Sequence, residues 1–275
     1  MIKEFPFHID AKLEYKLELL TKQLRIKDVW ILVDGDEGSG KTNMLSYLLY
    51  YFHCATGREF TIERLYFDSE AMFEWAKSNS NGLIGWDEAC LGGLSIEWWN
   101  RSQINLLKFA MMGRKKHHVF VLCIPRFDKL KEDLRIDRTH ALIHMNCGRK
   151  NDKYGHYMYI TRRGKKELNR LWKLKHIRCY ERAMRKYGGF GGWIPYVFPK
   201  LYDEDTYEKK KDEAISSIGK RKIDETKQQF REFKSKLTNI KFPVQTKKEF
   251  ARLLGLSYNT FKDWRLKATP LEMVG

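Results

Sequence analysis

The feature that most constrains this sequence is a glycine-rich octapeptide at residues 35–42, which we call the phosphate loop. It reads GDEGSGKT and fits the pattern G-x-x-x-x-G-K-[S/T] at every fixed position. At average residue usage, a chain of this length would match those positions by chance roughly one time in a hundred. The match therefore carries weight only if a strand precedes it and a helix follows it.

Both flanks have that context. The run VWILV at residues 29–33 is apolar throughout, which predicts a buried strand. After the loop, apolar side chains recur at helical spacing through Phe52. In this setting glycines let backbone N–H groups turn toward phosphate oxygens, and the helix directs its positive end at them. The expected nucleotide contacts are Gly35, Asp36, Glu37, Gly38, Ser39, Gly40, Lys41, Thr42 and Asn43. The alternative is a plain glycine turn before a helix.

The loop and a second motif together predict a hydrolytic site. Lys41 supplies a charge to the β- and γ-phosphates, and the Thr42 hydroxyl is a ligand for Mg²⁺. An apolar run at residues 83–86 ends in Asp87 and Glu88. An Asp at such a strand end holds a Mg²⁺-bound water, and the adjacent Glu orients or deprotonates the attacking water. The expected cofactors are ATP and Mg²⁺; the alternative for the acids is a solvated strand end.

Arginines near the next strand are candidates for contacting the γ-phosphate. Arg114 lies between an expected helix and an expected strand at residues 119–124, where a neighbouring subunit could use it as an arginine finger. Its alternative role is to neutralise a helix C-terminus. Arg126, Arg135 and Arg138 are weaker candidates for the same contact.

The remaining pattern predicts an α/β fold. Strand candidates at residues 65–67, 83–86 and 119–124 alternate with helical stretches, and residues 140–147 and 157–161 form a hairpin with a basic turn. Alternation of this kind is typical of a mainly parallel sheet, here with an antiparallel edge. A helix is also expected at residues 127–133.

The sequence pattern predicts three parts along the chain. We expect a P-loop domain over residues 1–200, with its core at about 26–165, and then a charged helical linker at 201–243. Residues 244–275 resemble a small all-α helix-turn-helix unit, because Thr246 and Glu249 form a capping box and Gly255 allows a tight turn. Such a unit either contacts DNA or docks a partner.

The charge balance indicates a polyanionic partner. The formal net charge is +17 over 275 residues, and residues 162–186 carry eleven Lys or Arg against two Glu. Phosphate-backbone contact is therefore expected there, against the alternative of a solvated charged face. The sequence shows no apolar run long enough for a membrane span and no signal peptide, and its five scattered cysteines suit reduced thiols. We expect a cytoplasmic protein.

In the order of these motifs, the chain resembles the FtsK/HerA-like group of additional-strand ATPases, which includes viral genome-packaging and Zot-like ATPases. The resemblance covers about residues 26–165 and rests on the phosphate loop, on Asp87-Glu88 and on Arg114 before the next strand. Many members carry a polar sensor at the end of that strand, where this chain has Pro125-Arg126.

The resemblance implies a ring, hexameric or pentameric, that hydrolyses ATP at subunit boundaries and moves double-stranded DNA, with Arg114 acting in trans. Genome packaging would add a viral portal or capsid protein as a partner. Two alternatives stay open: an AAA+-like ATPase that loads or remodels complexes on DNA, and a sequence-specific DNA-binding protein switched by nucleotide.

Overall fold

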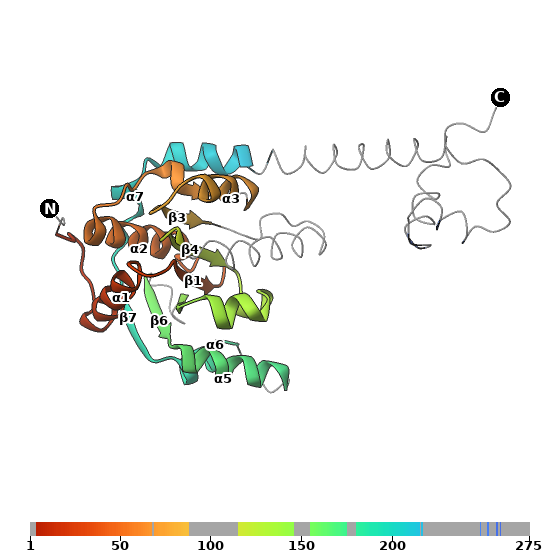
Figure 1. Cartoon of the computed structure of the whole chain (residues 1–275). Coiled ribbons are helices and arrows are strands. Elements are labelled where there is room, and N and C mark those ends of the chain that lie inside the picture. The colour runs from red at the N-terminus through yellow and green to blue at the C-terminus, as the bar shows by residue number, and fades with distance from the viewer. Residues whose placement is uncertain are drawn as a thin grey trace, which may run out of the picture. The chain divides into compact units, whose positions relative to one another are not determined.

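The computed structural model describes most of the first 216 residues (Figure 1). The described residues are 4–67, 69–87, 115–145, 155–174, 180–214 and 216, with Lys248, Arg252, Ser257 and Asn259 beyond them. The chain divides into two compact units, Met1–Ile215 and Ser216–Gly275. The predicted helix-turn-helix at 244–275 falls almost entirely outside the described residues, so it stays a prediction.

The first unit is built on a seven-stranded mixed sheet in the order β2-β3-β4-β1-β5-β6-β7. The strands are β1 (Val29–Gly35), β2 (Leu65–Tyr66), β3 (Leu83–Trp86), β4 (Val119–Ile124), β5 (Ala141–Met145), β6 (His156–Ile160) and β7 (Phe190–Trp193). The first five strands in spatial order are parallel to one another. β6 pairs antiparallel with β5, and β7 pairs antiparallel with β6. The mainly parallel α/β sheet with an antiparallel hairpin at one side is thus confirmed. β7 is a strand that the sequence did not predict.

Helices cover both faces of the sheet. They are α1 (Ala11–Gln23), α2 (Lys41–Thr56), α3 (Ser69–Ser78), α5 (Arg162–Lys173), α6 (Tyr180–Tyr187), α7 (Phe198–Leu201) and a further helical stretch at residues 204–214. One core layer joins β1 to α1 and α2 through Ile31 and Val33, and the other joins β1 to α3, α5 and α6 through Trp30 and Leu32. All seven β1 positions are buried, as expected for a central parallel strand with helices on both sides.

The segment after β4 differs from the helix expected at residues 127–133. It forms a 3₁₀ turn, Phe127–Lys129, and a π-helical turn, Asp133–Arg138. The guanidinium of Arg135 donates to the carbonyl oxygens of Asp128 (2.7 Å) and Leu130 (3.1 Å). Those carbonyls are thereby turned toward a side chain instead of toward a helical N–H, which is why an α-helix does not form.

A buried lysine holds the end of the π-helical turn. Lys165 of α5 has no exposed surface. Its Nζ donates to the carbonyl oxygens of Arg135 (3.2 Å) and Thr139 (2.5 Å) and to the Thr139 hydroxyl (2.7 Å). Burial lowers the Lys165 pKa to about 7. One member of the basic segment 162–186 is therefore a core residue that fixes α5 on the sheet.

The compact unit continues past residue 200. Residues 204–214, which the sequence assigns to a charged linker, form a helix whose Tyr207 is 5% exposed and packs edge-on against Phe198, with ring centroids 4.8 Å apart. Tyr202 is also buried. Among the described residues, none of the helices has the length and apolar character that a membrane crossing requires.

Candidate nucleotide-binding site

The phosphate loop connects β1 to α2 at the centre of the sheet. Three of its glycines have positive φ: Gly35 at 144°, Gly38 at 73° and Gly40 at 90°. A Cβ on Gly35 would lie 2.4 Å from the carbonyl oxygen of Met145, so no other residue fits there. Gly40 takes the left-handed N-cap position before Lys41, which begins α2. The loop therefore keeps the backbone conformation that the motif predicts.

Lys41 reaches back across this loop. Its Nζ donates to the carbonyl oxygens of Gly35 (3.0 Å) and Asp36 (2.7 Å). An ammonium group has three donors and no acceptor, so these two carbonyls leave donor capacity for a phosphate oxygen. Lys41 is thus placed over the mouth of the loop, where the chemistry assigned to it requires it.

Inside the loop, Ser39 offers a polar atom without a partner. Its side chain is 2% exposed, and its Oγ is buried with no hydrogen bond to any described residue. A buried hydroxyl left unpaired costs about 1–3 kcal/mol. A phosphate oxygen in the loop would satisfy it. This orphaned donor is an independent sign that the loop is shaped for an anion.

Thr42 and Asp87 meet although they are 45 positions apart in sequence. The Thr42 hydroxyl donates to Oδ2 of Asp87 over 2.8 Å, and Asp87 is fully buried at the end of β3. Mg²⁺ in phosphate-transfer sites commonly takes one or two protein oxygens and fills its remaining positions with water and phosphate. A hydroxyl and a carboxylate beside a phosphate loop therefore fit Mg²⁺ held together with a nucleotide.

Tyr207 is the residue that the sequence did not reveal. Its hydroxyl donates to the same Asp87 Oδ2, also over 2.8 Å. It comes from the helix at residues 204–214, where it is a lone aromatic in a charged stretch. That isolation was the available signal, because a single large apolar side chain in a polar helix marks the face that is buried.

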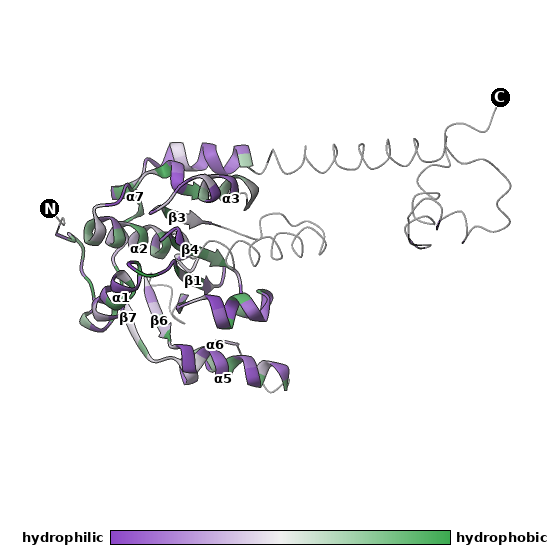
Figure 2. Cartoon of the chain, in the orientation of Figure 1, coloured by the Kyte–Doolittle hydropathy of each residue, from purple (hydrophilic) through white to green (hydrophobic). Residues whose placement is uncertain are grey.

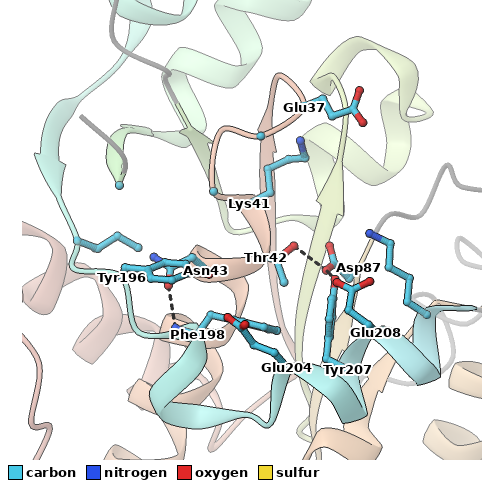
Figure 3. A pocket seen from close by; sticks show the side chains of 15 residues that line it. Glu37, Lys41, Thr42, Asn43, Asp87, Tyr196, Phe198, Glu204, Tyr207 and Glu208 are labelled. Carbon is cyan, nitrogen blue, oxygen red and sulfur yellow. Dashed lines mark hydrogen bonds between the residues drawn. The ribbon is translucent and has the colours of Figure 1, made fainter. Parts of the chain in front are cut away.

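These groups line a cavity of about 770 Å³ (Figure 3). Its lining comprises Glu37, Gly38, Gly40, Lys41, Thr42, Asn43, Asp87, Gly155, Ile194, Tyr196, Phe198, Glu204, Tyr207, Glu208 and Lys211. Figure 3 shows Asp87, Tyr207 and Glu208 at one side of Lys41, and Tyr196 with Asn43 at the other. The cavity thus has an acidic side and an aromatic side, separated by the phosphate loop.

Asn43 lines this cavity but its amide is committed elsewhere. Its Nδ2 donates to the carbonyl oxygen of Pro195 (3.0 Å), and its Oδ1 accepts from the backbone N–H groups of Val197 (2.8 Å) and Phe198 (3.1 Å). Asn43 was expected to contact the nucleotide, and this stays a prediction. In the structure it fixes the chain segment that forms the aromatic side of the cavity.

The other predicted residues are placed as follows. Glu88 and Arg114 fall outside the described residues, so their assignments as water-activating base and trans arginine finger stay predictions. Arg126 pairs with Asp128 (Nε to Oδ1, 2.9 Å) and its guanidinium lies 4.7 Å from the centre of the Tyr180 ring. Arg135 is buried on the carbonyl groups described above. Neither of these two arginines lines the cavity.

A buried carboxylate fixes the end of the strand that leads into the phosphate loop. Asp34, one residue before Gly35, is fully buried. Its Oδ1 lies 2.9 Å from Nδ1 of His144, and its Oδ2 accepts from the Phe127 backbone N–H (3.0 Å) and from the Tyr180 hydroxyl. Burial, and then the charge of Asp34, raise the Tyr180 pKa. The strand end that carries the phosphate loop is therefore tied to β5, to the turn after β4 and to α6.

Comparison with known proteins does not extend this description. No family model and no curated protein matches this chain. The arguments that follow therefore rest on the geometry and chemistry of its own residues.

Proposed function

We propose that this protein is a Mg²⁺-dependent ATPase. The observation that carries the proposal is the contact between Thr42 and Asp87 across the carboxyl edge of the sheet. It brings the only fixed hydroxyl of the motif and a buried carboxylate together beside a glycine loop with an unpaired Ser39 hydroxyl and a positioned Lys41. These are the groups that phosphoryl transfer uses to hold the metal and the phosphates.

The strand order supports placement among the additional-strand ATPases. β4 lies between β1, which leads into the phosphate loop, and β3, which ends at Asp87. The register pairs Asp34 with Ile124 on β4 and Trp86 with Leu122. One strand therefore separates the two motif-bearing strands, which is consistent with an additional strand in the sheet. Pro125, at the end of β4, accepts a backbone hydrogen bond from Gly35 (3.4 Å).

We further propose that the ATPase acts as a ring-shaped oligomer that moves double-stranded DNA in the cytoplasm and packages a viral genome. Exposed basic side chains on α5 and α6 support a DNA contact: Arg162, Arg163, Lys166, Arg170, Lys173, Arg182, Arg185 and Lys186. Figure 2 shows hydrophilic residues along much of α5. Phosphate contacts by such side chains supply affinity without sequence preference.

The first test is ATP hydrolysis with and without double-stranded DNA. Wild type should hydrolyse ATP only with Mg²⁺ and faster with DNA. Lys41→Ala and Glu88→Gln should each lose at least about 100-fold in rate, on the scale of losing a principal electrostatic or acid–base contribution. Lys22→Ala, at an exposed position of α1, is the matched control and should behave as wild type. Magnesium-independent activity, or full activity in Lys41→Ala, would refute the ATPase proposal.

The second test separates a motor from the alternatives. A triplex-displacement assay on duplexes of increasing length should show a delay that grows with length if the protein translocates. Arg163→Glu with Lys166→Glu should weaken DNA binding and lower the salt slope by about two, since each phosphate contact contributes roughly 0.9. Length-independent displacement would favour a loading ATPase, and one strongly preferred sequence would favour a nucleotide-switched DNA-binding protein.

A further inference from the structure

The aromatic side of the cavity has a different chemistry from the acidic side. Gly155 and Ile194 are among its lining residues, and the Ile194 N–H donates to the Gly155 carbonyl oxygen over 3.0 Å. A Cβ on Gly155 would lie 2.1 Å from the carbonyl oxygen of Ile194, so this position must be glycine. Tyr196 also lines the cavity, two positions after Ile194 in the chain. Glycine here keeps the surface flat where β6 begins and β7 has just ended.

Tyr196 is held at the cavity by the residues on either side of it. The Asn43 amide binds the backbone of Pro195, Val197 and Phe198, as described above. Val197 is fully buried and Phe198 is 6% exposed, whereas Tyr196 is 61% exposed. The segment is thus anchored before and after the tyrosine while the phenol ring stays open to solvent. An exposed aromatic ring on an anchored backbone loses little conformational entropy when a ligand covers it.

The anchoring residue links this ring to the phosphate loop. Asn43 follows Thr42 directly on the first turn of α2, so a ligand whose phosphates occupy the loop lies next to the segment that Asn43 holds. Figure 3 shows the Tyr196 side chain beside Asn43, on the side of Lys41 away from Asp87. Of the lining residues, Gly155, Ile194 and Tyr196 carry no charge.

We propose that Tyr196 is the stacking surface for the nucleobase of the bound triphosphate, and that Gly155 and Ile194 form the floor of the base pocket. The inference rests on the proposed ATP site and names the residues of that site that would bind the base. A nucleoside triphosphate has a charged end and a flat apolar end. The cavity offers the Lys41 ammonium group and the phosphate loop for the first, and the exposed Tyr196 ring for the second. Base–aromatic stacking needs only a π-face, and so it tolerates different bases.

The test compares a ligand with a base and a ligand without one. Binding of Mg·ATP and of inorganic Mg·tripolyphosphate is measured by calorimetry on the full chain. Tyr196→Ala should weaken ATP binding by roughly 5- to 150-fold, the range found for removing one stacking aromatic. Tripolyphosphate binding should be unchanged. Tyr196→Phe keeps the ring and should bind ATP within about twofold of wild type, because stacking does not need the hydroxyl.

The control is Tyr15→Ala. Tyr15 lies on α1, is 57% exposed, and does not line the cavity, so its loss should leave both affinities unchanged. If wild type binds both ligands and Tyr196→Ala binds ATP as tightly as wild type, the base assignment is refuted and the ATP site stands. An equal loss of both ligands in Tyr196→Ala also refutes the assignment. If wild type binds neither ligand, the proposed ATP site itself fails.

Discussion

Replacing Tyr207 with phenylalanine removes one hydroxyl from the acidic side of the cavity and leaves the ring in place. Oδ2 of Asp87 accepts two hydrogen bonds of 2.8 Å, from Thr42 and from Tyr207, and a carboxylate oxygen has two lone pairs. A metal ion or a metal-bound water at this oxygen must displace one of the two donors. Thr42 belongs to the phosphate loop, so Tyr207 is the donor that we expect to leave.

The variant should lose stability and gain ligand affinity. A hydrogen bond to a charged group contributes about 1.5–3 kcal/mol. For a unit of this size, that loss lowers Tm by roughly 3–12 °C. The same energy no longer opposes metal binding, so the affinity for Mg·ATP should rise, by about tenfold at the lower figure. The two effects have opposite signs, which distinguishes this account from general damage to the fold.

Thermal unfolding and calorimetric titration with Mg·ATP measure the two effects in one preparation. Tyr159→Phe is the matched control, because Tyr159 is equally buried, at 5% exposure, but lies on β6 outside the cavity lining. Its Mg·ATP affinity should not change. Weaker Mg·ATP binding by Tyr207→Phe would refute the displacement argument, since the hydroxyl would then support the bound metal instead of competing with it.

Three further predictions concern stability and are measured by denaturant unfolding. Burial lowers the pKa of His118 to about 4 from 6.5. Below pH 6.5 the unfolded chain binds a proton at His118 that the folded protein does not bind, so the folded protein loses stability. Wild type should therefore lose about 2 kcal/mol of unfolding free energy between pH 7 and pH 5 that His118→Gln does not lose. Equal pH profiles would contradict this. Lys165→Ala should cost about 3 kcal/mol because it leaves buried acceptors unpaired, whereas the exposed neighbour Lys166→Ala should change stability by less than about 0.5 kcal/mol; similar losses would refute the anchoring role. Asn43→Ala should cost about 2–3 kcal/mol through the loss of its three hydrogen bonds, and an unchanged unfolding free energy would show that the segment is held without it.

The sequence predicted the parts of the fold that local pattern determines. β1 and the phosphate loop follow from a continuous apolar run and fixed glycines, and each is recognisable within a short window. β7 was missed because Phe190-Gly-Gly-Trp193 lacks alternation and reads as a break. It forms since β6 offers an edge to pair with. A Cβ at position 192 would lie 2.0 Å from Oδ2 of Asp10, so a side chain there would require Asp10 to move.

The same difference between local and long-range information separates the site residues that were predicted from those that were missed. Lys41, Thr42 and Asp87 were predicted because each belongs to a motif with a known chemical reason for its spacing. Tyr196 and Tyr207 were not predicted. The position of Tyr196 depends on the Asn43 amide, whose hydrogen bond to Val197 joins segments 154 positions apart. The role of Tyr207 depends on its hydrogen bond to Asp87, 120 positions away. No window of sequence contains such information.

The contacts of Asp34, the residue before the phosphate loop, indicate when the site forms during folding. One carboxylate, Asp34, collects partners from Phe127, His144 and Tyr180, so the loop's foundation requires about 150 residues of chain to have come together. Contacts of such long sequence separation form slowly and late. A fragment containing only β1, the loop and α2 would therefore contain the complete motif and still bind no triphosphate. The motif lies within eight consecutive residues, but the conformation that binds a ligand requires the folded domain.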